Sequence, residues 1–121
     1  ASISVELIEV GRLFAIATEM TADGLVKPTS YQISKGLMAN NVQLDDRYYK
    51  SALTDLTGKG TIYFDELKEY TQYNIYITAG SDVPYASANI MKDSDTLQIQ
   101  IQTLKNPSNL FFFEKLLFIN L

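Results

Sequence analysis

Two stretches of this chain alternate with a period of two, and this alternation constrains the fold more than any other feature. In residues 73–79 every second side chain is apolar or aromatic, and in residues 97–103 a leucine and two isoleucines alternate with three glutamines. Successive side chains of a β-strand point to opposite faces, whereas a helix would spread them around its circumference. We therefore predict two strands with one buried face each. Their solvated face carries a glutamine row that limits stray pairing, formed by Gln98, Gln100 and Gln102.

Weaker alternation at other points predicts further strands. Turn signals such as Asp23-Gly24 separate short apolar runs. Short strands spaced about ten residues apart, with turns between them, are typical of a sandwich or barrel. Residues 42–59 show no clear period and are expected to hold an irregular strand or one short helix. The other candidate strands are residues 3–10, residues 13–20, the run containing Pro28, Tyr31 and Ile33, and the pair Ile62 and Phe64.

The segment from Leu67 to Tyr73 has the spacing Leu-x-x-x-Thr-x-Tyr, with Thr71 in the middle. In this element the chain resembles fibronectin type III domains, where it joins strands E and F. The resemblance implies a tyrosine corner, in which the Tyr73 ring packs in the core and its hydroxyl turns back to an upstream backbone group. Leu67 would plug the core end of the same turn.

The resemblance implies an all-β fold, a seven-stranded antiparallel Greek-key β-sandwich of the fibronectin type III kind, over residues 1–105. Residues 3–10 and 13–20 would be strands A and B, and the run after Pro28 would start strand C. The core tryptophan usual in strand B is absent, so Phe14 or Ile16 would fill its volume. The glycine and proline usual in the E–F turn are also absent, with Lys68, Glu69 and Tyr70 in their place.

Composition excludes several function classes. The chain has no cysteine and no histidine, which removes thiolate zinc sites, cysteine nucleophiles and the commonest general base. The formal charge is −4 with acids and bases interspersed, so no basic stripe predicts nucleic-acid binding. We expect no enzymatic activity, no cofactor and no metal site. Calcium is the alternative for loop acids, which are more often solvated turn formers: Asp45, Asp46, Asp82, Asp93 and Asp95.

The chain contains eight tyrosines, a residue type that suits recognition surfaces. Tyr31 and Tyr73 are expected in the core, whereas Tyr63 and Tyr76 point to the opposite face and are expected to form cross-strand pairs. Tyr85 lies with Asp82 in the loop after residues 73–79, which the resemblance assigns to strand F. Because such loops carry binding in sandwich folds, these two residues are a candidate ligand loop.

The composition changes sharply after residue 105. Residues 106–121 read as a linker followed by a hydrophobic C-terminal segment, in which nine of the last twelve residues are apolar. This apolar extension is shorter than the roughly 20 residues that a helix needs to span a bilayer. It is therefore expected to be covered by the domain's own flank, a second copy, a neighbouring domain or a membrane surface. The predicted interface residues are Leu110, Phe111, Phe112, Phe113, Leu116, Leu117, Phe118 and Ile119.

These observations predict a non-catalytic structural or interaction module, either a processed form or a piece of a longer protein. It would belong to an extracellular or cell-surface assembly, such as one used in cell adhesion. It would dock to a protein partner or a second copy through the hydrophobic C-terminal segment. The alternative is an independent domain that binds peptide or carbohydrate through loop tyrosines.

Overall fold

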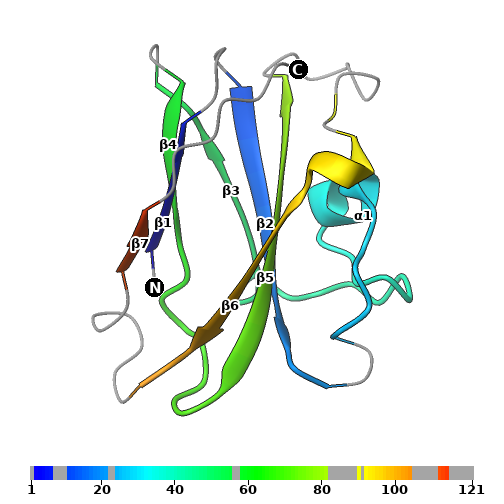
Figure 1. The fold of residues 1–121 in the computed structure, drawn as a ribbon, viewed down its shortest axis with the longest axis vertical. Coiled ribbons are helices and arrows are strands. Elements are labelled where there is room, and N and C mark those ends of the chain that lie inside the picture. Colours follow the sequence, from blue (N-terminus) through cyan, green and yellow to red (C-terminus); the bar gives the residue numbers. More distant parts are fainter. Residues whose placement is uncertain are drawn as a thin grey trace.

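The strands form two β-sheets that face each other, with a short helix outside one of them (Figure 1). The computed structural model describes residues 2–6, 11–21, 24–55, 58–81, 90, 92–104 and 112–114. The first sheet has the order β4-β1-β7 and consists of β1 (Ser2–Glu6), β4 (Lys59–Tyr63) and β7 (Phe112–Glu114). The second has the order β3-β2-β5-β6 and consists of β2 (Gly11–Glu19), β3 (Tyr49–Leu53), β5 (Gln72–Ser81) and β6 (Leu97–Gln102). The predicted all-β class is confirmed at this level.

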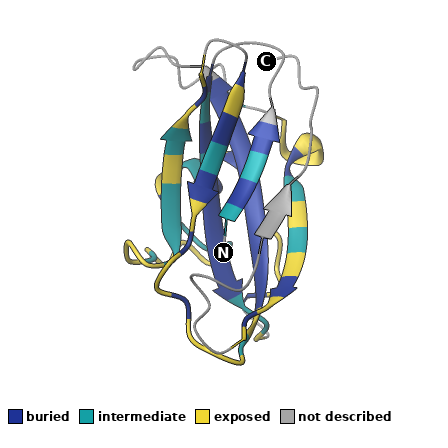
Figure 2. Ribbon diagram, turned by 90° about the vertical axis from the view of Figure 1, so that its left-hand side faces the viewer, coloured by how far each residue is buried: buried dark blue, intermediate teal, exposed yellow. Residues whose placement is uncertain are grey.

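The main core lies between the two sheets, where buried strands of the second sheet stand behind the first (Figure 2). Alternation sets which side chains enter it, because every second residue of each strand points inward. The first sheet contributes Ile3, Val5 and Ile62, and the second contributes Leu13, Ala15, Ala17, Tyr73, Ile75, Ile77, Ala79 and Ile101.

The two strands with the clearest alternation form as predicted. β5 and β6 pair antiparallel, with Ile75 opposite Ile99. Gln98, Gln100 and Gln102 are exposed, so the predicted solvated glutamine row is confirmed.

The predicted strand after Pro28 is wrong, because the chain forms helix α1 (Ser30–Lys35) there. The Thr29 side chain accepts a hydrogen bond from the Gln32 backbone N–H, and the Gln32 side chain accepts one from the Thr29 backbone N–H. This capping box satisfies two backbone donors that a helix start leaves free. Tyr31, expected in the core, is 57% exposed because it points away from the sheet, whereas Ile33 is fully buried.

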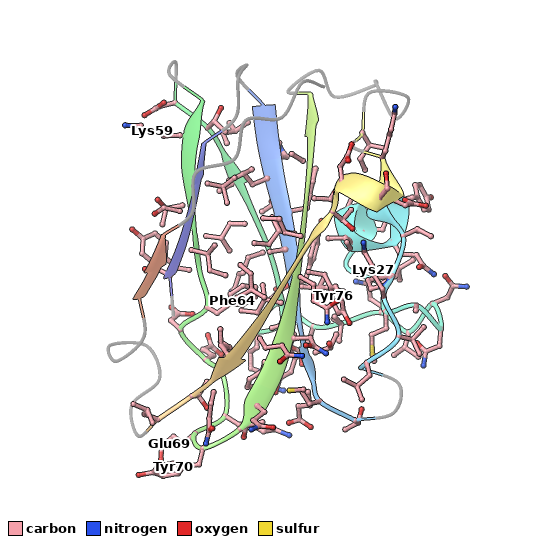
Figure 3. The ribbon with its side chains drawn as sticks, viewed as in Figure 1. Lys27, Lys59, Phe64, Glu69, Tyr70 and Tyr76 are labelled. Carbon is pink, nitrogen blue, oxygen red and sulfur yellow. The ribbon has the colours of Figure 1, made fainter. Side chains whose placement is uncertain are left out.

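Tyr76 points to the outer face of the second sheet as predicted, but this face is not solvated at β5. Tyr76 is fully buried and forms a second, smaller cluster with Ile16 and Ile33. Figure 3 shows its side chain on the side of β5 toward α1. Helix α1 and the segment before it cover β5 side chains that alternation alone assigns to the protein surface.

The prediction that residues 13–20 take the place of strand B is wrong as well. In the fibronectin type III architecture strand B shares a sheet with strand E. β2 instead lies in the second sheet between β3 and β5, and the strand that pairs with β4 is β1. Ile16 lies under α1, so it does not fill the missing tryptophan volume in the main core; Phe14 packs against the same outer cluster.

The stretch with no clear period, residues 42–59, contains β3 and the first residue of β4, and its described residues directly before and after β3 are irregular. The Tyr49 hydroxyl donates to the Ser34 carbonyl at 2.6 Å, which ties β3 to the end of α1.

Candidate functional site

The segment between β4 and β5 carries the tyrosine corner that its spacing predicts. The Tyr73 ring is fully buried, and its hydroxyl oxygen accepts a hydrogen bond from the Lys68 backbone N–H at 3.0 Å. Leu67 is also buried against the main core. Burial raises the pKa of Tyr73, while the Lys68 hydrogen bond acts in the opposite direction.

Thr103 locks this corner to the end of β6, a role that its position in the sequence does not signal. Its hydroxyl donates to the Lys68 carbonyl and accepts from the Thr71 N–H at 3.0 Å. The Thr103 N–H in turn donates to the Thr71 carbonyl at 3.0 Å. The Thr71 hydroxyl donates to the Glu69 carbonyl at 2.9 Å, so this predicted corner residue also forms a hydrogen bond within the turn.

A pocket of about 220 Å³ opens beside the corner. Its wall includes the aromatic pair Tyr48 and Tyr73, whose ring centroids lie 6.2 Å apart. Met38 and Leu44 add apolar surface, and Thr18 adds a hydroxyl that already donates to the Gly24 carbonyl at 3.0 Å. The lining suits a small group with an apolar body.

Charged side chains stand around this pocket. Lys68 and Glu19, both in its lining, form an ion pair at 2.7 Å, and the hydrogen bond to Glu19 raises the pKa of Lys68. The Arg47 guanidinium lies 5.2 Å from the Tyr48 ring centroid and pairs with Asp45 at 3.0 Å. Hydrogen bonds from Arg47 lower the pKa of Asp45.

The C-terminal segment meets the first sheet at β7. β7 pairs with β1 in parallel, with Phe112 opposite Ser2 and Glu114 opposite Ser4. β1 is thereby held between β4 and β7. The remaining predicted interface residues lie outside the described part of the chain: Leu110, Phe111, Leu116, Leu117, Phe118 and Ile119.

The other predicted site residues do not come together in the described ranges. Asp93 accepts a hydrogen bond from the Ser30 N–H at 2.7 Å and so fastens η1 (Asp93–Asp95) to the start of α1. Asp82 and Tyr85 lie outside the described residues. Within those residues no three carboxylates gather in a group that could hold a metal ion, and no helix there has the length and apolar character to cross a membrane.

Comparison with known proteins gives no relative for this chain: no protein-family model, curated protein or solved structure matches it.

Proposed function

We propose that this chain is a non-catalytic interaction module of a surface or extracellular assembly, which docks to a protein partner or a second copy through its hydrophobic C-terminal segment. The observation that carries the proposal is the parallel pairing of β7 with β1. An edge of the sandwich accepts a strand from this segment, and addition of a strand to a sheet edge is a recurring mode of protein recognition.

The arrangement of the strands supports a fibronectin type III-like, Greek-key sandwich for this module. In that architecture strands B and E share one sheet, while C, F and G form the other. β1 and β4 would correspond to B and E, and β2, β5 and β6 to C, F and G, because the latter three lie in that order in one sheet. The tyrosine corner falls before β5, where strand F would begin.

In this assignment β7 lies beside β1 at the place that strand A takes in the family. It comes from the other end of the chain and runs parallel to β1. Only three residue pairs join the two strands, so the edge of β1 accepts a short strand by backbone hydrogen bonds. Such a short pairing can be exchanged for the same segment of a second copy or for the strand of a partner.

The apolar composition of the segment supports docking. Burying one large apolar side chain gives roughly 1.5–3 kcal/mol, and eight such residues lie between Leu110 and Ile119. Contiguous apolar patches on a protein surface mark interaction sites.

The test compares the solution mass of residues 1–121 with that of residues 1–108 by light scattering on a sizing column. The shortened chain is expected to stay folded and to have a smaller solution mass than the full chain. The double variant Phe112→Ser/Phe113→Ser is a second probe, because it keeps the backbone and removes two apolar side chains. Equal masses and equal stability for all three would refute docking through this segment.

A second candidate function is ligand binding, favoured by the pocket beside the corner. Its volume of about 220 Å³ suits a group as small as one aromatic or sugar ring. The test is thermal stabilisation by small sugars and short peptides, compared between the wild type, Tyr48→Ala for the pocket and Tyr85→Ala for the predicted loop. A ligand that stabilises the wild type and Tyr85→Ala but not Tyr48→Ala binds in the pocket, and the reverse pattern places it at the loop. If no ligand stabilises the wild type, this candidate function is rejected.

A further inference from the structure

β6 is the last strand of its sheet among the described residues. It pairs with β5 on one side, and no described strand pairs with the other side. In Figure 2 it forms the margin of the second sheet, with alternating exposed and half-buried residues.

The backbone groups that face this open side can be assigned from the hydrogen bonds of the neighbouring strands. The Thr103 N–H donates to the Thr71 carbonyl, so Thr103 faces β5. The Gln72 carbonyl, one residue further on, accepts from the Met20 N–H on the opposite side of β5. Because backbone groups alternate sides in an antiparallel ladder, every second residue before Thr103 also faces β5. The N–H and C=O groups of Gln98, Gln100 and Gln102 therefore face the open edge.

This edge lacks the features that usually keep edge strands apart. β6 contains no charged residue and no proline, whereas the edge strands β3 and β4 carry Lys50 and Lys59. An uncharged edge strand without proline, in which leucine and isoleucine alternate with glutamine, favours pairing with another strand. The sequence predicts that the glutamine row limits stray pairing with unrelated strands, but the row favours a second copy, because an amide both donates and accepts hydrogen bonds and so complements another amide.

We propose that the β6 edges of two copies of this chain pair antiparallel, which joins two four-stranded sheets into one continuous sheet. Pairing across a two-fold axis uses all the open backbone groups when Gln100 lies opposite Gln100 of the second copy. Gln98 then lies opposite Gln102 of the second copy.

The charges at the two ends of β6 favour a second copy as the partner. Asp93 and Asp95 precede the strand, and Lys105 follows it in the sequence. Antiparallel pairing brings the acidic end of one strand to the end of the other where the chain continues to Lys105. The described part of the C-terminal segment pairs with β1 in the other sheet, so this inference does not rest on docking through that segment.

Single cysteines test the register, because the chain has no cysteine of its own. Directly opposed, hydrogen-bonded residues of antiparallel strands have Cα atoms about 5.5 Å apart, a distance that a disulfide bridges. In the proposed register Gln100→Cys meets this condition. The two copies of Gln98→Cys would be displaced by four residues, roughly 14 Å along the strands at about 3.4 Å per residue.

Under mild oxidation, Gln100→Cys is expected to form disulfide-linked dimers at least about ten-fold faster than Gln98→Cys. The experiment is run in the full chain and again with Phe112→Ser/Phe113→Ser, so that association through the C-terminal segment is recognised separately. Equal rates for the two cysteine variants in both backgrounds would overturn the proposal.

A charge variant gives an independent measurement. In the Phe112→Ser/Phe113→Ser background, Gln100→Lys would place two like charges on the two-fold axis, so the solution mass is expected to fall to that of a monomer. Ser51→Lys is the matched control, since Ser51 is an exposed residue of β3 at the opposite edge of the same sheet. Both side chains are exposed, and circular dichroism checks that both variants fold. If the Phe112→Ser/Phe113→Ser protein is monomeric at every concentration measured, or if the two charge variants in that background have equal masses, the pairing is contradicted.

Discussion

At the scale of single residues, Tyr70 shows how the corner forms without a glycine at its left-handed position. Its φ of 52° lies in the left-handed region that glycine enters freely and other residues rarely adopt. Tyr70 is 66% exposed, and its side chain extends away from the lower end of the sheets (Figure 3). The turn thus forms with Tyr70 in the left-handed conformation, at a local conformational cost.

Tyr70→Gly is expected to raise the free energy of unfolding by up to about 1 kcal/mol, because it relieves the left-handed strain. Tyr63→Gly is the matched control, since Tyr63 is equally exposed at 65% but lies in β4. That control is expected to lower stability by about 0.5–1 kcal/mol. Urea unfolding measures both, and a loss of stability in Tyr70→Gly would contradict the account of the turn.

Two buried tyrosines predict a loss of stability at alkaline pH. Burial raises the pKa of Tyr73 and of Tyr76 above the usual value of about 10. The unfolded chain therefore loses these protons first, so stability is complete below pH about 10 and falls as the pH rises above it. Thermal unfolding between neutral and alkaline pH measures this. Tyr76→Phe is expected to flatten the fall, and an unchanged slope in that variant would argue against ionisation of Tyr76 as a cause.

At the scale of elements, α1 depends on contacts beyond its own length. Six residues are too few for a helix to be stable in isolation. The capping box at Thr29, the left-handed end at Gly36 with φ 73°, and the packing of Ile33 on Ile16 and Tyr76 supply what the helix lacks. A Cβ at Gly36 would also approach the Tyr49 ring to 2.7 Å, so helix end and β3 pack closely.

Thr29→Ala is expected to lower the free energy of unfolding by about 0.5–2 kcal/mol, because the Gln32 N–H loses its side-chain acceptor. Thr29→Ser keeps a hydroxyl and serves as the control, with stability close to that of the wild type. Urea unfolding gives the size of the loss, and hydrogen exchange at the Gln32 amide gives its location. Equal exchange in the two variants would mean that the cap does not hold the helix start.

At the scale of the whole molecule, the buried Gly24 carbonyl joins the segment between β2 and α1 to the second sheet. The Gly24 carbonyl accepts hydrogen bonds from Thr18 at 3.0 Å, Asn74 at 3.3 Å and Tyr76 at 3.2 Å. These donors come from β2 and β5, so one backbone oxygen between β2 and α1 joins both strands. Removing donors one at a time would leave the carbonyl partly satisfied, which makes the arrangement tolerant of single changes.

The approach of the two sheets predicts a coupled pair of mutations. A Cβ on Gly60 of β4 would lie 2.8 Å from Leu13 Cδ1 of β2, so Gly60→Ala is expected to cost about 1–3 kcal/mol by overpacking. Leu13→Ala is expected to cost about 2–5 kcal/mol by leaving a cavity. The double variant should cost less than the sum by about 0.5–3 kcal/mol, because the added methyl occupies released space. Strict additivity in urea unfolding would show that the sheets do not meet at this point.

The sequence by itself determined the features that depend on local periodicity and spacing. The faces of β5 and β6 toward the core, the glutamine row and the Tyr73 corner follow from side-chain alternation and from a fixed offset along the chain. The high proportion of apolar residues from Leu110 onward likewise predicts that this segment is covered, although it does not identify the surface that covers it.

Tertiary structure decided which faces are covered and which strands are neighbours. The sequence assigns Tyr76 to the outward face, but only the tertiary structure shows that α1 and the Gly24 carbonyl cover it. In the same way, residues 13–20 pair with β5 and not with β4. The capping residues Thr29 and Gln32 could have predicted the helix, but the alternation of Tyr31 and Ile33 favoured a strand. The attachment of β7 to β1 was open among several alternatives. The physical reason is that burial and pairing depend on segments distant in the chain, whereas periodicity records only the direction of each side chain along its own strand.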